Sequence, residues 1–174
     1  MELSDVAASA GAVSARVVFV PGEPLRTCEV PGLAAATLAA LPGLRGHRCD
    51  NGAGLTFADE LADTEIAHLI EHAALELMAM SGCSPLLRGE TKWDFATDGR
   101  GVFRVSIEYE DERLARGALD SSVALVRALA RGEAPAGMEA EARRLRGRQS
   151  RQTSAMLLRV AGVSDSDHGL ESAG

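Results

Sequence analysis

A helix with a one-sided apolar pattern, between Asp63 and Gly82, constrains the fold of this chain more than any other feature. An α-helix turns by about 100° per residue, and at that angle its apolar side chains fall on one face. They are Ile66, Leu69, Ile70, Ala73, Leu77 and Met80. Asp63 or Thr64 can accept hydrogen bonds from the free N–H groups of the first turn, and Gly82 is typical of a helix end. Such a face has to be buried, so we expect the helix to pack into a core.

Residues 101–110 (GVFRVSIEYE) alternate between apolar and polar side chains, which is typical of a half-buried β-strand. The apolar set is Phe103, Val105, Ile107 and Tyr109, and the polar set is Arg104, Ser106, Glu108 and Glu110. A second strand is expected over 15–20, and helices are expected over 33–41, 111–131 and 138–145. We therefore predict an α+β fold: a single domain in which a small sheet packs against helices, one of which carries an H-x-x-E-H motif.

The chain of 174 residues is long enough for one domain with a substantial core. Hydrophobic residues make up 46% and charged residues 25%, a balance that is typical of globular proteins. Residues 1–13 are small and polar without periodicity, so we expect a flexible N-terminal tail before a domain at 14–150. Residues 151–174 end in a polar segment, and we expect a C-terminal extension that is largely flexible.

The formal net charge of −7 argues against nucleic acid as a partner and suits a cationic substrate better. No run of eighteen apolar residues occurs, and the first residues, MELSDVAASA, lack the pattern of a signal peptide. The odd number of cysteines, without C-x-x-C spacing, favours reduced thiols. These observations predict a cytoplasmic protein without a membrane partner, and a homo-oligomer is compatible with them.

Three residues of the predicted helix have the spacing of a metal-binding motif. His68 and His72 are four residues apart, so their side chains leave the helix on the same side, about 5 to 6 Å apart, and can share one ion. Catalytic zinc sites use three protein ligands, and two imidazoles supply two of them. The order His68, Glu71, His72 is the H-x-x-E-H signature of inverzincins. We expect zinc as the cofactor and Glu71 as the catalytic general base.

The third metal ligand is not fixed by this motif. We favour Glu76, which continues the stripe of the two histidines, so that the predicted ligands are His68, His72 and Glu76. The helix rises about 1.5 Å per residue, so Glu76 needs a bend or a long rotamer to reach the ion. A resemblance to pitrilysin-type inverzincins implies a glutamate from a helix further downstream, and a loop histidine is another alternative. These other candidates are Glu139, Glu141 and His47.

The same residues admit a structural interpretation. Two histidines on a helix can form a partly buried polar face without a metal, and Glu71 or Glu76 can be solvated carboxylates. Cys49 and Cys83 are interpreted as small core residues rather than nucleophiles, because no neighbour in the sequence would stabilise a thiolate.

Three segments in order, LPGLRGHRCD, HLIEHAALEL and VFRVSIEYEDE, resemble the N-terminal domain of cyanophycin synthetase over residues 15–148. The positions in step with the motifs of that family are Pro42, Gly43, His47, Cys49, His68, Glu71, His72, Leu75, Glu76, Leu77, Glu108, Tyr109 and Glu112. Residues 85–100 depart from the family's Gly-x-Thr-Arg stretch and keep only Gly89, Thr91 and Lys92.

The resemblance implies a metallopeptidase-like site that, in some members, clips an arginine-rich polymer into shorter primers. We expect a zinc-dependent hydrolase of peptide or isopeptide bonds, with a peptide or an arginine-rich, cyanophycin-like polymer as its substrate. The alternative is a non-catalytic module that binds a peptide or the polymer, or serves in assembly, and retains the fold. Full-length members carry an ATP-grasp and a Mur-ligase-like domain after this one, so we do not expect synthetase activity here.

Overall fold

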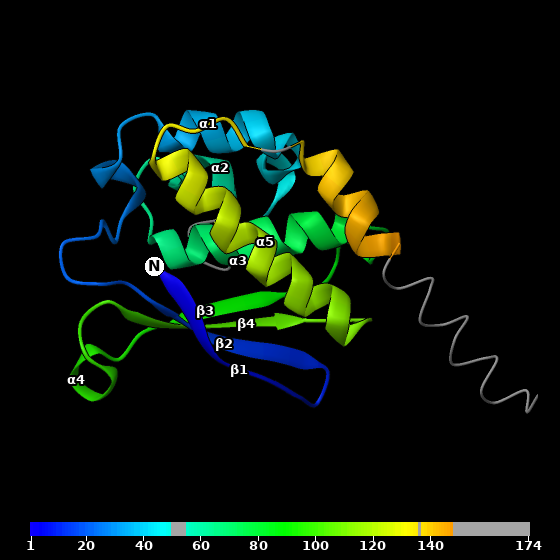
Figure 1. The fold of residues 1–174 in the computed structure, drawn as a ribbon, viewed down its shortest axis with the longest axis horizontal. Coiled ribbons are helices and arrows are strands. Elements are labelled where there is room, and N and C mark those ends of the chain that lie inside the picture. The colour runs from blue at the N-terminus through cyan, green and yellow to red at the C-terminus, as the bar shows by residue number, and fades with distance from the viewer. Residues whose placement is uncertain (50–54, 136, 148–174) are drawn as a thin grey trace, which may run out of the picture.

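The fold is α+β, as the sequence patterns predict, with an antiparallel sheet below a layer of helices (Figure 1). The computed structural model describes residues 1–49, 55–135 and 137–147. Its four strands lie in the order β1-β2-β4-β3. Their bounds are Glu2–Ser9 for β1, Ala12–Val18 for β2, Gly89–Lys92 for β3 and Val102–Glu108 for β4. The expected C-terminal extension at 151–174 lies outside the described residues.

Two long helices lie across the sheet (Figure 1), α3 at Ile66–Met80 and α5 at Glu112–Ala130. The shorter helices are α1 at Leu33–Ala40, α2 at Phe57–Glu60 and α4 at Phe95–Asp98, and 3-10 turns lie at Thr27–Glu29 (η1) and Pro42–Gly46 (η2). Helical backbone also spans 138–147. The helices predicted over 33–41, 111–131 and 138–145 are thus confirmed. Within the described ranges, no helix is long and apolar enough to cross a bilayer.

Strand β4 confirms the alternation predicted for 101–110, and its neighbour β2 repeats it. The buried positions are Phe103, Val105 and Ile107 in β4 and Val13, Ala15 and Val17 in β2. These side chains lie opposite one another across the two strands, with Val17 paired to Phe103 and Ala15 to Val105. Because both central strands turn their apolar side towards the helices, the core lies between the sheet and α3 and α5.

The flexible tail expected at 1–13 is wrong, because an edge strand occupies most of it. β1 pairs with β2 in antiparallel register along nearly its whole length. The two strands meet at Ala10 and Gly11, whose φ angles of 45° and 86° suit the type I′ turns of two-residue hairpins. The small side chains of this segment give no apolar alternation, and main-chain pairing with β2 supplies the order instead.

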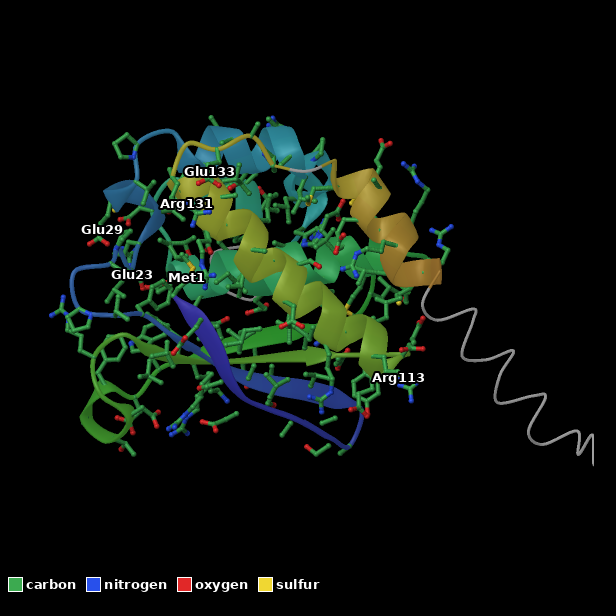
Figure 2. The ribbon with its side chains drawn as sticks, viewed as in Figure 1. Met1, Glu23, Glu29, Arg113, Arg131 and Glu133 are labelled. Atoms are coloured by element: carbon green, nitrogen blue, oxygen red, sulfur yellow. The ribbon has the colours of Figure 1, made fainter. Side chains whose placement is uncertain are left out.

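Charge contacts also hold the start of the chain. The amino group of Met1 pairs with the Glu23 carboxylate (Figure 2), and Arg127 of α5 donates a hydrogen bond to the Met1 carbonyl oxygen. Residues 1–13 are therefore part of the folded domain and not a tail before it.

Helix α3 packs by its predicted apolar face against β3, β4 and α5. The residues fully buried on that face are Ile66, Leu69, Ile70, Ala73 and Leu77. This packing confirms the prediction that the apolar face of the helix is buried in the core. It also fixes the opposite stripe, which carries the two motif histidines, in place relative to the sheet.

The first turn of α3 differs from the prediction, since neither Asp63 nor Thr64 caps it. Glu65 is the N-cap residue, without a side-chain cap, and the Leu25 carbonyl oxygen accepts the hydrogen bond of the Ile66 N–H at 2.8 Å. The Thr64 hydroxyl is turned instead to the histidine stripe of the helix. A tertiary contact has thus replaced the local cap that the sequence indicated.

Candidate functional site

The polar stripe of α3 faces the loop that follows η2. His68 and His72 project from adjacent turns, and their Nε2 atoms lie 3.1 Å apart. Cys49 enters from the loop, with its Sγ 3.8 Å from His68 Nε2 and 3.5 Å from His72 Nε2. One ligand atom from each of the three residues lies within 4.8 Å of the others. Three possible metal ligands from two elements therefore converge on one point, and we call them the Cys49–His68–His72 cluster.

The separations in this cluster fit the geometry of tetrahedral zinc. Typical Zn–N and Zn–S bonds at tetrahedral angles place two nitrogens about 3.3 Å apart and a nitrogen about 3.6 Å from a sulfur. The structure has 3.1 Å for the nitrogen pair and 3.5 and 3.8 Å for the two sulfur contacts. One thiolate and two imidazoles are also donors that zinc accepts, with a fourth position left for water or substrate. The cluster has the size and the chemistry to hold zinc.

His72 is a neutral imidazole in an enclosed position. Its ring stacks on Phe57 of α2, with centroids 3.9 Å apart and planes 14° apart, and the residue is only 4% exposed. Burial, together with the nearby rings of His68 and His47, lowers the pKa of His72 to about 2. Burial also lowers the pKa of His68, against the opposing charges of Glu60 and Glu65. Neutral imidazoles are the form that binds a metal.

The thiol of Cys49 has no local group that would ionise it. Burial, together with the charges of Glu60 and Glu71 and a hydrogen bond to Glu60, raises the pKa of Cys49 to about 12. The expectation that nothing stabilises a thiolate here thus agrees with its surroundings. Sequence reasoning nevertheless missed that this thiol touches both motif histidines. The available signal was the segment LPGLRGHRCD, which places Cys49 directly after a turn that packs on α3.

Glu71 is buried beside the cluster and is held by the edge strand β3. It is 4% exposed, and its Oε2 accepts a hydrogen bond of 2.6 Å from the Thr91 hydroxyl. Gly89 lies so close that a Cβ there would collide with the Glu71 carboxylate. Burial raises the pKa of Glu71 to about 7, aided by the charge of Glu90 and opposed by the Thr91 hydrogen bond and by His47. Gly89 and Thr91 of β3, two of the residues kept from the motif, thus position this carboxylate.

Glu76, the predicted third ligand, contacts His47 rather than the cluster. Its Oε2 lies 3.0 Å from His47 Nε2, and His47 Nδ1 lies 3.0 Å from His72 Nδ1. Gly43 of η2 leaves room for this carboxylate, since a Cβ at that position would overlap it. His47 therefore separates Glu76 from His72. Direct ligation by Glu76 stays a prediction, whereas the sulfur of Cys49 already lies against both histidines.

The two downstream glutamates have other neighbours. The side chain of Glu139 is 85% exposed and is 4.0 Å from Arg143, while Glu141 bonds to Ser121 and Arg144. The pitrilysin-like alternative for the third ligand therefore has no geometric support from these contacts.

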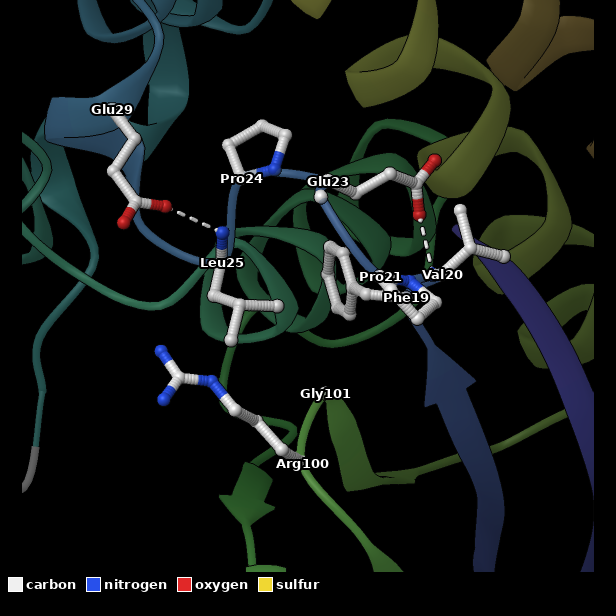
Figure 3. Close-up of a pocket in the computed structure, with 10 residues that line it drawn as sticks. Phe19, Val20, Pro21, Glu23, Pro24, Leu25, Glu29, Arg100 and Gly101 are labelled. Carbon is white, nitrogen blue, oxygen red and sulfur yellow. Dashed lines mark hydrogen bonds between the residues drawn. The ribbon is translucent and has the colours of Figure 1, made fainter.

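A cavity of about 620 Å³ lies elsewhere, between the segment 19–25 and the turn at Arg100 and Gly101 (Figure 3). Its rim is tied by main-chain bonds, with the Phe19 N–H donating to the Gly101 carbonyl oxygen at 2.9 Å. Glu23 and Glu29 accept hydrogen bonds from neighbouring main-chain N–H groups of the same rim. None of the residues that line this cavity belongs to the cluster.

The fold and the cluster define a class: a small α+β domain in which one helix and one loop bring a cysteine and two histidines together beside a buried glutamate. Comparison with known families makes this specific. The sequence model of the cyanophycin synthase-like N-terminal domain matches residues 17–131, more than half of the chain. The protein belongs to this family, which confirms the resemblance noted from its motifs.

Curated relatives agree with the family. The cyanophycin synthetase of Trichormus variabilis is 34% identical over 109 residues, which are 62% of this chain and 12% of that protein. The cyanophycin synthetase of a Nostoc species has the same values, and that of a Synechocystis species is 33% identical over 102 residues, or 58% and 11% of the two chains. The chain thus matches about an eighth of the length of these relatives.

Proposed function

We propose that this protein is a zinc-dependent hydrolase that cleaves peptide or isopeptide bonds. The observation that carries the proposal is the convergence of Cys49 Sγ, His68 Nε2 and His72 Nε2 within 4.8 Å, beside a buried glutamate on the same helix. Three protein ligands and one open position are the arrangement of catalytic rather than structural zinc sites. Cys49 takes the place of the third ligand in this proposal, and Glu76 takes a supporting one.

The residues of the chain have distinct tasks in such a reaction. His68, His72 and Cys49 would hold the ion, which when bound acts as a Lewis acid on the scissile carbonyl and makes water easier to deprotonate. Glu71 would accept the proton of the attacking water. Thr91 would orient the Glu71 carboxylate through its 2.6 Å hydrogen bond.

A cationic, arginine-rich polymer is the substrate that we propose. The curated relatives are cyanophycin synthetases, and the expectation of an arginine-rich polymer comes from that resemblance. The charges around the site agree with it: Glu60 acts on His68 and Cys49, and Glu90 acts on Glu71. The chain as a whole has a net charge of −7. Negative potential favours the approach of arginyl side chains.

The direct test is metal analysis of the purified protein together with an assay for hydrolysis of an arginine-rich polymer. We expect about one zinc per chain, activity that chelators remove and added zinc restores, and no activity in Glu71→Gln, which keeps the shape of the side chain but cannot accept the proton. A wild-type protein that binds no zinc, or a Glu71→Gln variant as active as wild type, would overturn the hydrolase.

One observation favours the second function, a non-catalytic module that binds the polymer or serves in assembly. Glu71 is 4% exposed and bonded to Thr91, as a structural carboxylate would be. The variant His68→Ala separates the two functions. If it abolishes hydrolysis but leaves polymer binding intact, the site is catalytic. If wild type binds the polymer without cleaving it, the binding module is correct.

A further inference from the structure

We infer that Glu76 and His47 form a positioning chain that fixes the tautomer of His72, so that the lone pair of its Nε2 points at the cluster. This inference rests on the proposed zinc site and gives Glu76 a role other than ligation. It is built on three contacts in a row: Glu76 Oε2 to His47 Nε2, His47 Nδ1 to His72 Nδ1, and His72 Nε2 to Cys49 Sγ.

The chain begins at Glu76, because an ionised carboxylate can only accept hydrogen bonds. The Nε2 of His47, 3.0 Å away, must therefore carry the proton and donate it. Both side chains are partly buried, with exposed fractions of 20% for His47 and 13% for Glu76. Gly43 allows the approach, since any side chain there would displace the carboxylate.

The proton on His47 Nε2 decides the next contact. A neutral imidazole with its proton on Nε2 offers a lone pair on Nδ1. His72 Nδ1 lies 3.0 Å from His47 Nδ1, so with His47 neutral it is His72 that donates, and the neutral His72 ring then keeps a lone pair on Nε2. That atom is the one 3.5 Å from Cys49 Sγ and 3.1 Å from His68 Nε2. Turning the His47 ring over would put carbon at both contacts and lose both hydrogen bonds.

The hydrogen-bond partner of His68, unlike that of His72, does not fix the tautomer. Its Nδ1 lies 2.9 Å from the Thr64 hydroxyl, which can either donate or accept. In the metal-free protein His68 can therefore carry its proton on Nε2 and donate it to the lone pair of His72, 3.1 Å away. The two ligand histidines thus differ: one tautomer is imposed by Glu76 and His47, and the other is free to change when an ion binds. Metal-bound histidines commonly depend on such outer partners.

The first experiment reads the tautomers without any metal. The chain has four histidines, and long-range ¹H–¹⁵N NMR of metal-free protein at neutral pH, assigned with single His→Gln variants, distinguishes Nδ1–H from Nε2–H. We expect Nδ1–H in His72 and Nε2–H in His47. A spectrum with Nε2–H in His72 overturns the inference, whether or not the protein later proves to bind zinc or to hydrolyse anything.

The second experiment measures zinc affinity by competition with a chelator. Glu76→Leu removes the acceptor, and we expect a loss of affinity of about 10- to 100-fold, the usual effect of an outer-shell partner. Glu76→Gln keeps an oxygen that can accept from His47, and it should restore most of the affinity. Glu139→Leu is the matched control, because that side chain is exposed and lies outside the cluster, and it should bind like wild type.

The outcomes of this second experiment separate the two claims. Failure of wild type to bind zinc rejects the proposed function alone. Zinc binding that is equal in wild type and a folded Glu76→Leu variant rejects the positioning chain. Loss in Glu76→Leu together with equal loss in Glu76→Gln would instead indicate that Glu76 is itself a ligand, and would also reject the chain.

Discussion

At the scale of single residues, two glycines next to the site determine where its acidic side chains can lie. Gly43 makes room for Glu76 and Gly89 makes room for Glu71, because a Cβ at either glycine would overlap the carboxylate that packs against it. The motif residues of α3 could be predicted from sequence because i, i+4 spacing dictates a shared face. The position of Cys49, the third ligand in our proposal, could not, because this residue reaches the histidines only through the packing of a loop against the helix.

Gly89→Ala tests the seat of Glu71. The new Cβ would overlap the carboxylate in a buried position, so we expect a loss of about 1 to 3 kcal/mol in the free energy of unfolding. If the hydrolase proposal holds, the displaced carboxylate should also reduce turnover. Denaturant unfolding and the hydrolysis assay measure these effects. Gly46→Ala is the control, since nothing lies within 4 Å of its added Cβ. Equal stability of the two variants would contradict the close contact.

Cys49→Ser tests the assignment of the third ligand. The hydroxyl is a far poorer zinc donor than a thiolate, so we expect zinc affinity to fall by more than about 100-fold, beyond the 10- to 100-fold typical of outer-shell changes. Chelator competition gives the affinity. Cys83→Ser provides the comparison, because that thiol is buried outside the cluster. Zinc binding that survives Cys49→Ser would return Glu76 to the list of ligands.

At the scale of elements, the helices and strands with a regular apolar pattern were the ones that could be predicted. The strand at 101–110 and the helix that became α3 have strong two-fold and 3.6-fold patterns, and both are present with their expected faces buried. β1 was missed because its residues, ELSDVAAS, show no regular apolar alternation, and its order comes from pairing with a strand that follows it. The N-terminal cap of α3 was misplaced because Thr64 bonds across to Thr27 and His68.

Helix α4 is joined to the outer face of the sheet by Asp98, which gives a prediction about pH. Hydrogen bonding to Arg104, with help from Arg16 and against the cost of burial, holds the pKa of Asp98 below its ordinary value. The ion pairs therefore stabilise the fold above the ordinary aspartate pKa of about 3.9, and this contribution is lost as the pH falls through the lower folded-state pKa. We expect Asp98→Asn to lower the melting temperature at pH 7 but to change it little at low pH.

Melting curves between pH 7 and pH 2 check this, with Asp120→Asn on the exposed side of α5 as the control. An Asp98→Asn protein whose melting temperature differs from wild type by the same amount at every pH would show that the carboxylate acts by shape and not by charge.

At the scale of the whole molecule, one face of the sheet is covered by helices and one edge is closed by the first strand. The sequence predicted the α+β class and the two-layer packing, because amphipathic helices and alternating strands must share one core. It did not predict the extent of the folded unit, since β1 adds an edge that no local pattern announces.

Deletion of residues 2–9 tests the importance of that edge. Without β1, the apolar strand β2 becomes an unpaired edge, so we expect a lower melting temperature and a tendency to associate. Amide exchange should speed up along Ala12–Val18, and size-exclusion chromatography should show larger species. A truncated protein with the protection and elution volume of wild type would mean that this strand contributes nothing to the fold.

Helix α3 has two roles: one side packs into the hydrophobic core and the other carries His68 and His72. A substitution that rotated it to suit a different ligand would open the hydrophobic interior. Substitutions that adapt such a domain to new substrates are therefore expected in the segments around α3. These are the loop of His47 and Cys49 and the short strand of Gly89 and Thr91.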